Sequence, residues 1–169
     1  MDTVIWVDEN DVVIGEIPRS KAHEEGLLHR IAVVYVVNER GEILVQERMS
    51  GRFDHSSAGH VDPGETYESA AKRELTEELD IKNVALKELL SASISYDTES
   101  HTGNKVRHMY RFFEYRGEPQ AVNYKEMRRV FWQNPMDVWR DMQNDMDNKK
   151  YTGGFKSSLK NYLKIKNIS

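Results

Sequence analysis

Three glutamates, Glu74, Glu77 and Glu78, stand at the i, i+3 and i+4 positions of a helical spacing. With about 3.6 residues per turn they share one helix face, where each like-charge pair destabilises the helix by roughly 0.2–0.5 kcal/mol. A bound divalent cation that prefers oxygen ligands, Mg²⁺ or Mn²⁺, would turn this repulsion into attraction. The spacing is compatible with a cation site, although an acidic face exposed to solvent is the commoner explanation for such a charge run taken alone.

The same helix carries an apolar stripe about a hundred degrees away from the glutamates, made of Ala71, Leu75 and Leu79. This stripe would anchor the helix on a sheet and leave the glutamates at its edge. Arg73 is spaced to pair with Glu65 or Glu77 and to hold that carboxylate in one orientation. We predict a helix over residues 65–79, preceded by a Pro-Gly turn.

The elements around this helix mix strands with helices. The run 31–37 is nearly unbroken in its hydrophobicity and rich in β-branched residues, which is typical of a strand buried on both faces. The other predicted elements are a β-hairpin at about 3–17, a helix at 21–25 ended by Gly26, strands at 42–46, 84–96, 105–116 and 129–132, and helices at 135–142 and 155–163. This order predicts an α/β fold with a mixed sheet between helices, in a single domain over residues 1–169.

Composition excludes several classes of protein. The sequence has no cysteine, which excludes a disulfide scaffold, a thiolate metal site and a cysteine nucleophile. The net charge of −4 lacks the basic footprint of general nucleic-acid binding and disfavours anionic membranes. No apolar run reaches the roughly 18 residues that span a bilayer, and the acidic N-terminus is unlike a signal peptide. We therefore expect a cytoplasmic protein that does not act at a membrane.

The glutamate helix is part of a longer pattern that resembles the box of the Nudix hydrolases. That box reads Gly, five residues, Glu, seven residues, then Arg-Glu-apolar-any-Glu-Glu-any-Gly-apolar. Residues 59–81 match it at Gly59, Glu65, Arg73, Glu74, Leu75, Glu77, Glu78 and Ile81. Asp80 stands where the box has Gly, and because Asp tolerates the left-handed backbone conformation better than most residues, we expect only a small cost there.

The resemblance implies an α/β/α sandwich that hydrolyses a pyrophosphate bond in a nucleoside diphosphate derivative or a similar organic pyrophosphate. The implied cofactor is Mg²⁺, with Mn²⁺ as the alternative. Its implied ligands are Gly59, through the carbonyl group, and Glu74, Glu77 and Glu78. Glu65 and Arg73 would orient this metal shell. The expected partner is accordingly a small-molecule pyrophosphate.

Several residues are candidates for the general base that accepts a proton from the attacking water. Glu77 or Glu78 could act directly, or a loop carboxylate could act instead, with Glu126 as the first candidate and Glu99 as the second. Other side chains could hold the rest of the substrate: Phe53, Tyr67 and Tyr96 by stacking, and Arg52 and Arg107 through phosphates. Core packing is the alternative for the aromatic residues, and ordinary surface charge for the arginines.

The N-terminal half resembles the branch of the family related to isopentenyl-diphosphate isomerase, through residues 6–8, 19–23 and 27–30. That enzyme uses a catalytic cysteine and a second metal site made by three histidines and two glutamates. His23, His29 and His60 match the three histidines, with the spacing between the first two one residue short. The resemblance thus implies a second metal site, since imidazole suits zinc and other transition ions. Structural histidines are the alternative.

Other parts of the isomerase machinery are missing from the sequence. Ala58 corresponds to the cysteine, and the two glutamates fall near Gly103 and Lys105. We therefore expect a hydrolase, and keep an isomerase-type enzyme and a non-catalytic nucleotide-binding sensor as alternatives. The intact glutamate set disfavours the sensor. The N-terminal hairpin could pair two copies into a homodimer, which the sequence alone does not decide.

Overall fold

Strand β3 (Leu28–Val37) is the centre of a mixed sheet in the computed structural model, which describes residues 2–169. Strand β8 (Lys105–Arg116) runs parallel to β3 along its whole length. On its other side β3 pairs antiparallel with β6 (Ser57–His60), and β1 (Thr3–Val7) and β4 (Ile43–Arg48) join it nearer its ends. The sheet continues outward with β2 (Val13–Pro18) on β1, β5 (Phe53–Asp54) and β9 (Met127–Gln133) on β4, and β7 (Lys87–Thr98) on β8.

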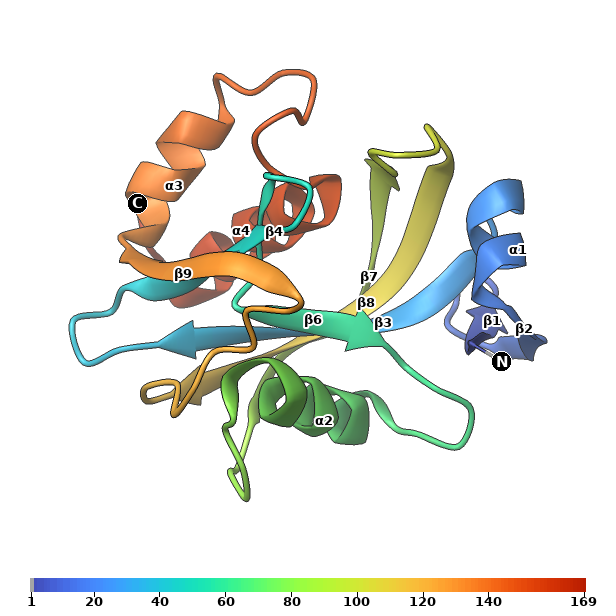
Figure 1. The fold of residues 1–169 in the computed structure, drawn as a ribbon, viewed down its shortest axis with the longest axis horizontal. Coiled ribbons are helices and arrows are strands. Elements are labelled where there is room, and N and C mark those ends of the chain that lie inside the picture. Colours follow the sequence, from blue (N-terminus) through green and yellow to red (C-terminus); the bar gives the residue numbers. More distant parts are fainter. Residues whose placement is uncertain (1) are drawn as a thin grey trace.

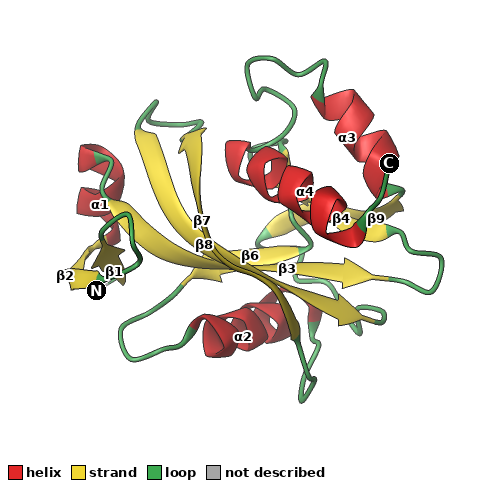
Figure 2. Ribbon diagram, turned by 180° about the vertical axis from the view of Figure 1, so that it is seen from behind, coloured by secondary structure: helices red, strands yellow, loops and turns green. Residues whose placement is uncertain are grey.

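Helices lie on both faces of this sheet (Figure 1). Helix α2 (Tyr67–Leu79) covers one face, and α3 (Pro135–Met142) and α4 (Gly153–Lys166) cover the other, as Figure 2 shows from behind. Helix α1 (Arg19–Glu25) lies beside the β1–β2 hairpin, at the end of the sheet that this hairpin forms. The predicted sandwich of helices around a mixed sheet is confirmed.

The sequence of β3 explains why both of its faces are covered, because successive strand side chains point to opposite faces. The core under α2 contains alternate residues of the strand and the apolar stripe of the helix: Ala32, Val34, Val36, Ala71, Leu75 and Leu79. The core under α3 and α4 contains the intervening strand residues and side chains of α4: Val33, Tyr35, Val37, Phe155 and Leu159. The predicted burial of residues 31–37 on both faces is thus confirmed.

Local interactions fix both ends of α2. The Thr66 side chain accepts a hydrogen bond from the Ser69 amide, and the Ser69 side chain accepts one from the Thr66 amide. This capping box starts the helix at Tyr67, two residues after the predicted start. At the other end Asp80 has a φ of 54°, and its amide donates to carbonyls of the last turn. Asp80 therefore ends the helix in the left-handed conformation, as predicted.

A buried chain of polar groups holds α4 against the sheet. Ser158 Oγ lies 2.6 Å from both the Tyr35 hydroxyl and His55 Nε2. On the other side of the His55 ring, Nδ1 lies 2.7 Å from the Asp54 carboxylate. Asp54 also accepts a hydrogen bond of 2.9 Å from the Thr152 hydroxyl, which caps α4. Ser158 and Thr152 of the α4 segment thus contact polar groups on three residues of the sheet side, and these contacts specify one position for the helix.

Strands β5 and β6 go beyond the sequence prediction. The residues of β6 are Ser-Ala-Gly-His, which have little preference for strands. They form one because their backbone pairs with residues 31–34 of β3, a contact that no local pattern encodes. Strand β7 also begins at Lys87, three residues after its predicted start, and continues to Thr98.

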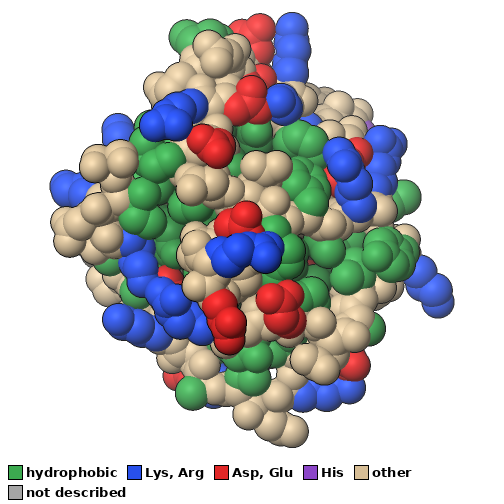
Figure 3. Space-filling model, turned by 90° about the vertical axis from the view of Figure 1, so that its left-hand side faces the viewer, with side chains coloured by type: hydrophobic (Ala, Val, Ile, Leu, Met, Phe, Trp, Pro, Cys, Tyr) green, Lys and Arg blue, Asp and Glu red, His purple; other side chains and the backbone are tan. Residues whose placement is uncertain are grey.

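The surface carries both signs of charge. Figure 3 shows acidic and basic side chains interspersed with hydrophobic ones over the face that is turned to the left in Figure 1. At the opposite end, β2 is the last strand of the sheet and exposes about half of Val13 and Ile14. This edge is where the predicted pairing of two copies would occur. Among the helices of residues 2–169, none has the length and apolarity to cross a membrane.

Candidate active site

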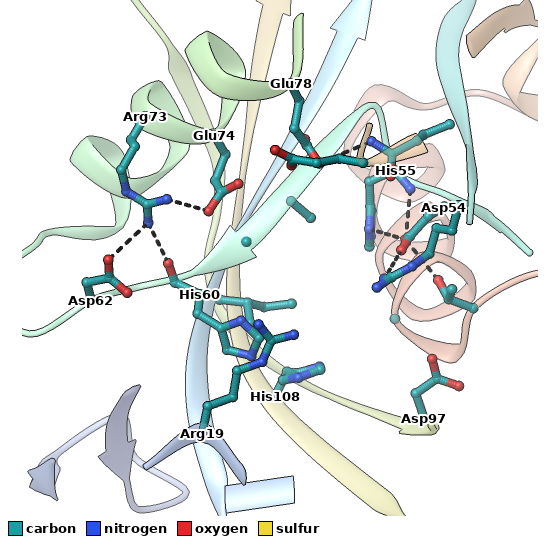
Figure 4. A pocket seen from close by; sticks show the side chains of 18 of the residues that line it. Arg19, Asp54, His55, His60, Asp62, Arg73, Glu74, Glu78, Asp97 and His108 are labelled. Atoms are coloured by element: carbon teal, nitrogen blue, oxygen red, sulfur yellow. Dashed lines mark hydrogen bonds and ion pairs between the residues drawn. The ribbon is translucent and has the colours of Figure 1, made fainter. Parts of the chain in front are cut away.

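A cavity of about 480 Å³ opens beside the C-terminal half of α2. Figure 4 shows its arrangement: Glu74 and Glu78 point into it from α2, with Arg19, His60 and His108 across from them. We call Gly59, Glu74, Glu77 and Glu78 the acidic wall. The cavity therefore brings the predicted metal ligands next to basic side chains that are far away in the sequence.

Arg73 organises the acidic wall through a fork of hydrogen bonds. Its Nε and Nη2 donate to the two oxygens of Glu65, at 2.9 and 3.0 Å. Its Nη1 donates to Glu74 at 2.6 Å, and Nη2 also donates to the His60 carbonyl at 2.9 Å. Glu77 lies farther away, at 3.5 Å. The predicted pairing with Glu65 is present, and the planar guanidinium fixes the orientation of Glu74 as well.

Gly59 leaves the space that Glu74 occupies. A Cβ atom at position 59 would overlap the Glu74 carboxylate, because β6 runs directly beside this helix face. The Glu74 side chain is only 13 % exposed, and burial raises its pKa although Arg73 acts in the opposite direction. Any larger residue at position 59 would displace the carboxylate from the cavity.

Glu78 is the most deeply buried carboxylate of the wall, at 7 % exposure. Gln46 Nε2 donates to one of its oxygens at 3.2 Å, while the other oxygen has no hydrogen-bond partner anywhere in residues 2–169. Burial, together with the nearby charge of Glu74, raises the pKa of Glu78 to about 8, although the Ser57 side chain acts in the opposite direction. Glu77 is half exposed and is not among the residues that line the cavity. An orphaned buried carboxylate oxygen beside a second buried carboxylate fits a divalent cation with oxygen ligands.

Two arginines that the sequence analysis did not single out face the acidic wall. Arg48 is half exposed and donates to Asp54 at 2.8 Å, and Arg19 is 41 % exposed and lies 3.3 Å from Asp2. Each guanidinium has five N–H donors, so both keep donors for a phosphate. No local pattern distinguishes these arginines from ordinary surface charge, so only the fold reveals them.

The arginines that the sequence analysis did single out are held by carboxylates of the protein. Arg52 makes a two-pronged contact with Asp97, at 3.0 and 3.2 Å, and its side chain is 13 % exposed. Arg107 donates to Glu9 at 3.2 Å. Both arginines thus pair with carboxylates of the protein and neither lines this cavity, so the phosphate role of Arg52 and Arg107 stays a prediction that the cavity does not favour.

The three aromatic residues considered for stacking also lie outside the cavity. Tyr67 is buried, and its hydroxyl donates to Asp11 at 2.9 Å. Phe53 packs against Phe131, with ring centres 5.2 Å apart. Tyr96 is 61 % exposed on β7, where it contacts the Arg107 guanidinium. The structure therefore corrects the stacking role that was expected for this set.

Four histidines meet on the side of the cavity opposite the acidic wall, and we call them the histidine cluster: His23, His29, His60 and His108. One ring nitrogen of each lies within 4.8 Å of those of the others. Burial lowers the pKa of His29 to about 4 and also lowers the pKa values of His60 and His108, so these three imidazoles are neutral at neutral pH. The sequence analysis missed His108, which joins because the parallel register places it opposite His29.

The two candidate loop carboxylates have different surroundings. Glu126 lines the cavity, is exposed to solvent and accepts a hydrogen bond of 2.8 Å from Asn123. Glu99 lies outside this cavity and accepts hydrogen bonds from His23 Nδ1, at 3.0 Å, and from the Thr102 hydroxyl, at 2.6 Å. Of the two, only Glu126 can reach a molecule bound beside the acidic wall.

Comparison with known proteins agrees with this geometry. The model of the NUDIX domain family matches residues 27–152. The chain belongs to this family. The solved structure of DR0079 from Deinococcus radiodurans superimposes with a TM-score of 0.73 at 21 % identity, covering 94 % of this chain and 97 % of that one. The predicted Nudix fold is therefore confirmed.

Relatives in sequence include Nudix hydrolases and isomerases. An uncharacterized Nudix hydrolase of Pseudomonas aeruginosa is 38 % identical over 93 residues, which are 52 % of this chain and 55 % of that protein. Another from Nostoc is 32 % identical over 140 residues, 78 % of this chain and 80 % of that protein. The isopentenyl-diphosphate Delta-isomerase of Streptomyces coelicolor is 32 % identical over 130 residues, 69 % and 65 % of the two chains. The chain thus spans only about half of the length of the Pseudomonas protein. The Nudix hydrolases and isomerases among these relatives confirm the predicted branch of the family.

Proposed function

We propose that this Nudix protein hydrolyses a pyrophosphate bond in a nucleoside diphosphate derivative or a similar organic pyrophosphate, with Mg²⁺ as its cofactor. The observation that carries the proposal is the pair of buried carboxylates, Glu74 and Glu78, facing Arg19 and Arg48 across one cavity. A pyrophosphate carries several negative charges, so an acidic wall binds it only through a cation. The Nudix hydrolases among its relatives support the same reaction class.

The metal ligands of this proposal are the carboxylates of Glu74, Glu77 and Glu78 and the carbonyl of Gly59. The orphaned oxygen of Glu78 and the space at Gly59 both fit this assignment. Bound Mg²⁺ would supply charge neutralisation and a lowered pKa for a water molecule. Mn²⁺ would suit the same oxygen ligands.

The other residues of the proposed site orient a metal ligand, bind the substrate or accept the proton of the attacking water. Arg73 and Glu65 fix the orientation of Glu74, and Arg48 and Arg19 would bind the phosphate oxygens farthest from the acidic wall. Glu126 at the rim is the candidate base that accepts a proton from the attacking water. Arg48 and Arg19 would then contact the pyrophosphate and Glu126 the attacking water, whereas Arg73 and Glu65 act through Glu74.

Isomerisation of a prenyl diphosphate fits the cavity less well. Ala58 lines the cavity where the resemblance places the isomerase cysteine, and no residue of the chain is a cysteine. Among the residues of the described chain that line the cavity, Ile31 and Ala58 are the apolar ones, so a hydrocarbon tail would find little apolar surface. A charged or polar group attached to the pyrophosphate would be better accommodated.

A substrate screen with the purified protein tests the proposal. Nucleotide sugars, dinucleotides, nucleoside triphosphates and prenyl diphosphates are incubated with and without Mg²⁺, and phosphate is measured after an added phosphatase cleaves any monoester product. We expect Mg²⁺-dependent release, reduced roughly 100-fold or more in Glu78→Gln and in Glu77→Gln. Glu68→Gln is the matched control, because Glu68 lies on the same helix, half exposed and paired with Lys72.

Two outcomes of the screen would contradict hydrolysis. An isomerised prenyl product, detected by NMR, would identify an isomerase-type enzyme instead. Tight nucleotide binding without turnover, unaffected by Glu77→Gln or Glu78→Gln, would identify a sensor.

A further inference from the structure

We propose that the end of the cavity beside the first turn of α4 is a phosphate subsite, which binds a phosphate group of the substrate other than the two joined by the scissile bond. The inference rests on the proposed hydrolytic function and names a class of substrate for it, a pyrophosphate that carries at least one further phosphate. We call this place the α4 subsite, and it consists of Arg48, Ser95, Gly153 and Gly154. None of these residues belongs to the acidic wall.

The first turn of α4 offers two backbone donors that have no acceptor. The Phe155 amide donates to the Thr152 hydroxyl, and the Lys156 amide donates to the Thr152 carbonyl. The amides of Gly153 and Gly154 have no hydrogen-bond acceptor among residues 2–169. Gly154 lines the cavity. Unpaired N–H groups and the positive end of the helix dipole together favour an anion at this position.

The two glycines differ in what their neighbours require. A Cβ atom at position 153 would collide with the Tyr96 carbonyl, so close packing against β7 requires glycine there. A Cβ atom at position 154 would make only ordinary contacts, 3.7 Å from the His55 ring and 3.8 Å from the Ser95 hydroxyl. Because glycine lowers the stability of a helix relative to alanine, packing alone does not explain Gly154. The missing side chain leaves the helix end open toward His55 and Ser95.

Ser95 directs an unpaired hydroxyl group toward the same end of the cavity. The residue is 1 % exposed, and its Oγ has no hydrogen-bond partner in the part of the chain that the structure describes. On the same face of the sheet, His108 lies opposite Ser95 on β8, and Asp97 lies two residues along β7. Both line the cavity, as do His55 and Gly154. A buried hydroxyl without a partner costs stability, and a phosphate oxygen would accept its hydrogen bond.

The charges next to α4 leave one cation for a phosphate. Asp54 and Asp97 are the carboxylates there, and each is paired with an arginine, Arg48 and Arg52 respectively. Arg52 uses both of its terminal nitrogens on Asp97. Arg48 gives one nitrogen to Asp54 and lines the cavity with its other donors. Arg48 can therefore bind a phosphate without giving up its contact with Asp54.

The donor set of the α4 subsite selects a phosphate and disfavours a nucleobase. Amides, a hydroxyl and a guanidinium are all hydrogen-bond donors, which suits the acceptor oxygens of a phosphate group. Among the residues of the described chain that line the cavity, there is no Phe, Tyr or Trp on which a base could stack. Helices α2 and α4 lie on opposite faces of the sheet (Figure 2), so the acidic wall and the α4 subsite would hold different phosphates of one molecule.

Phosphate binding by the full-length, chelator-treated protein tests the α4 subsite without an activity assay. Inorganic phosphate is titrated at constant ionic strength, and the amide resonances of Gly153 and Gly154 are followed by NMR; we expect both to shift and to saturate. Ser95→Ala should weaken phosphate binding roughly tenfold or more, the loss expected for one hydrogen bond to a charged group. Ser91→Ala is the matched control, because Ser91 is an exposed serine of the same strand. Gly154→Asp should abolish binding, because its carboxylate would enter the same space.

Two results of the titration would overturn the inference. One is a set of phosphate-induced shifts that leaves the Gly153 and Gly154 amides unaffected. The other is the same phosphate affinity in Ser95→Ala as in Ser91→Ala. Circular dichroism identifies variants that fail to fold, and the titration of the unmodified protein then decides the matter.

The substrate screen separates this inference from the proposed function. With Mg²⁺, Gly154→Asp should lower kcat/KM roughly tenfold or more for nucleoside triphosphates, which carry a third phosphate, and much less for nucleotide sugars, which do not. An equal loss for both kinds of substrate would overturn the assignment of the α4 subsite to a substrate phosphate. Saturable phosphate binding at Gly153 and Gly154 in a protein that is inactive on all pyrophosphates would support the subsite and refute only the hydrolase.

Discussion

The acidic wall and the histidine cluster face each other across one cavity, but they are assembled in different ways. The ligands of the acidic wall lie within residues 59–78, on one helix and the short strand beside it. The histidine cluster draws on α1, β3, β6 and β8, over 23–108. Helical periodicity is enough to bring the three glutamates of the first together, and Gly59 joins them through the pairing of β6 with β3. The second requires four separate elements to come together.

The two sides also differ in how they compensate for burial. On the acidic wall, Arg73 supplies positive charge to Glu65 and Glu74, and one oxygen of Glu78 remains unpaired. In the histidine cluster, burial keeps His29, His60 and His108 neutral, so no counter-charge is required. A charged wall and a neutral cluster should therefore respond differently to metals, to pH and to substitution.

The largest effect is expected at the rim of the acidic wall. Glu126→Gln removes the candidate base and should lower kcat about 100-fold or more, with little change in Mg²⁺ affinity. Steady-state kinetics on the best substrate of the screen measure this. Glu99→Gln should leave kcat nearly unchanged, because Glu99 lies outside the cavity. A larger loss of kcat in Glu99→Gln than in Glu126→Gln would mean that the base lies on the side of the histidine cluster. The two sides would then not have separate roles.

Gly59→Ala tests how tightly the acidic wall is packed. The new methyl group would displace Glu74, and a misplacement of about 1 Å can lower turnover on the order of 100-fold. Mg²⁺-dependent kinetics would show the loss. Gly15→Ala is the control, because a Cβ at Gly15 meets no atom within 4 Å. Wild-type turnover in Gly59→Ala would mean that Glu74 is free to move and is not held by β6.

Arg73→Lys tests whether the two sides are independent. Lysine cannot reproduce the fork that holds Glu65 and Glu74, so apparent Mg²⁺ affinity should fall roughly 10–100-fold. The resemblance to the isomerase branch implies a second metal in the histidine cluster, and Zn²⁺ affinity there should stay unchanged, since Arg73 contacts the cluster only through the His60 carbonyl. Lys72→Gln, on the exposed side of the same helix, serves as the control. An equal loss of both metals would show that the two sites are coupled.

The smallest effect is a gain in stability. Burial raises the pKa of Glu78 to about 8 from its ordinary 4.5, so between these values the folded chain holds a proton that the unfolded chain releases. The stability that the neutral carboxyl provides is complete below about pH 4.5 and is lost as pH rises through about 8. In chelator at about pH 8, Glu78→Gln should raise Tm, by about 2–4 °C for each kcal/mol recovered, and at about pH 4.5 the gain should vanish.

A melting experiment at both pH values, with Glu77→Gln as the control, measures this gain. Glu77 is half exposed, so its replacement should leave Tm unchanged. Equal melting temperatures of wild type and Glu78→Gln at the higher pH would mean that Glu78 is hydrated in the metal-free protein.

The sequence predicted those features that depend on local spacing. The glutamate face, the pairing of Arg73 with Glu65 and the left-handed end at Asp80 follow from residues close together in the chain. The strand β6 was missed because its small residues adopt an extended conformation only through pairing with β3. His108 was missed for a related reason, since the parallel register of β3 and β8 brings it to His29.

The substrate-facing cations show the same limit. Arg52 and Arg107 were singled out from the sequence, but they pair with Asp97 and Glu9 and neither lines the main cavity. Arg19 and Arg48 face the cavity because α1 begins and β4 ends beside it. An arginine's role depends on which carboxylate is nearer in space, and that is a property of the fold.

The buried chain of polar groups from Asp54 through His55 to Ser158 has a consequence for how the protein unfolds. The family model ends at residue 152, yet α4 begins at Gly153 and its first turn forms part of the cavity surface. The segment that the family model matches therefore lacks a helix whose side chains belong to the core of this protein. A truncation that kept only residues 27–152 would leave the buried His55 and Tyr35 without their partner and would also remove His23. We expect such a fragment to melt at a lower temperature and over a broader range than the whole chain.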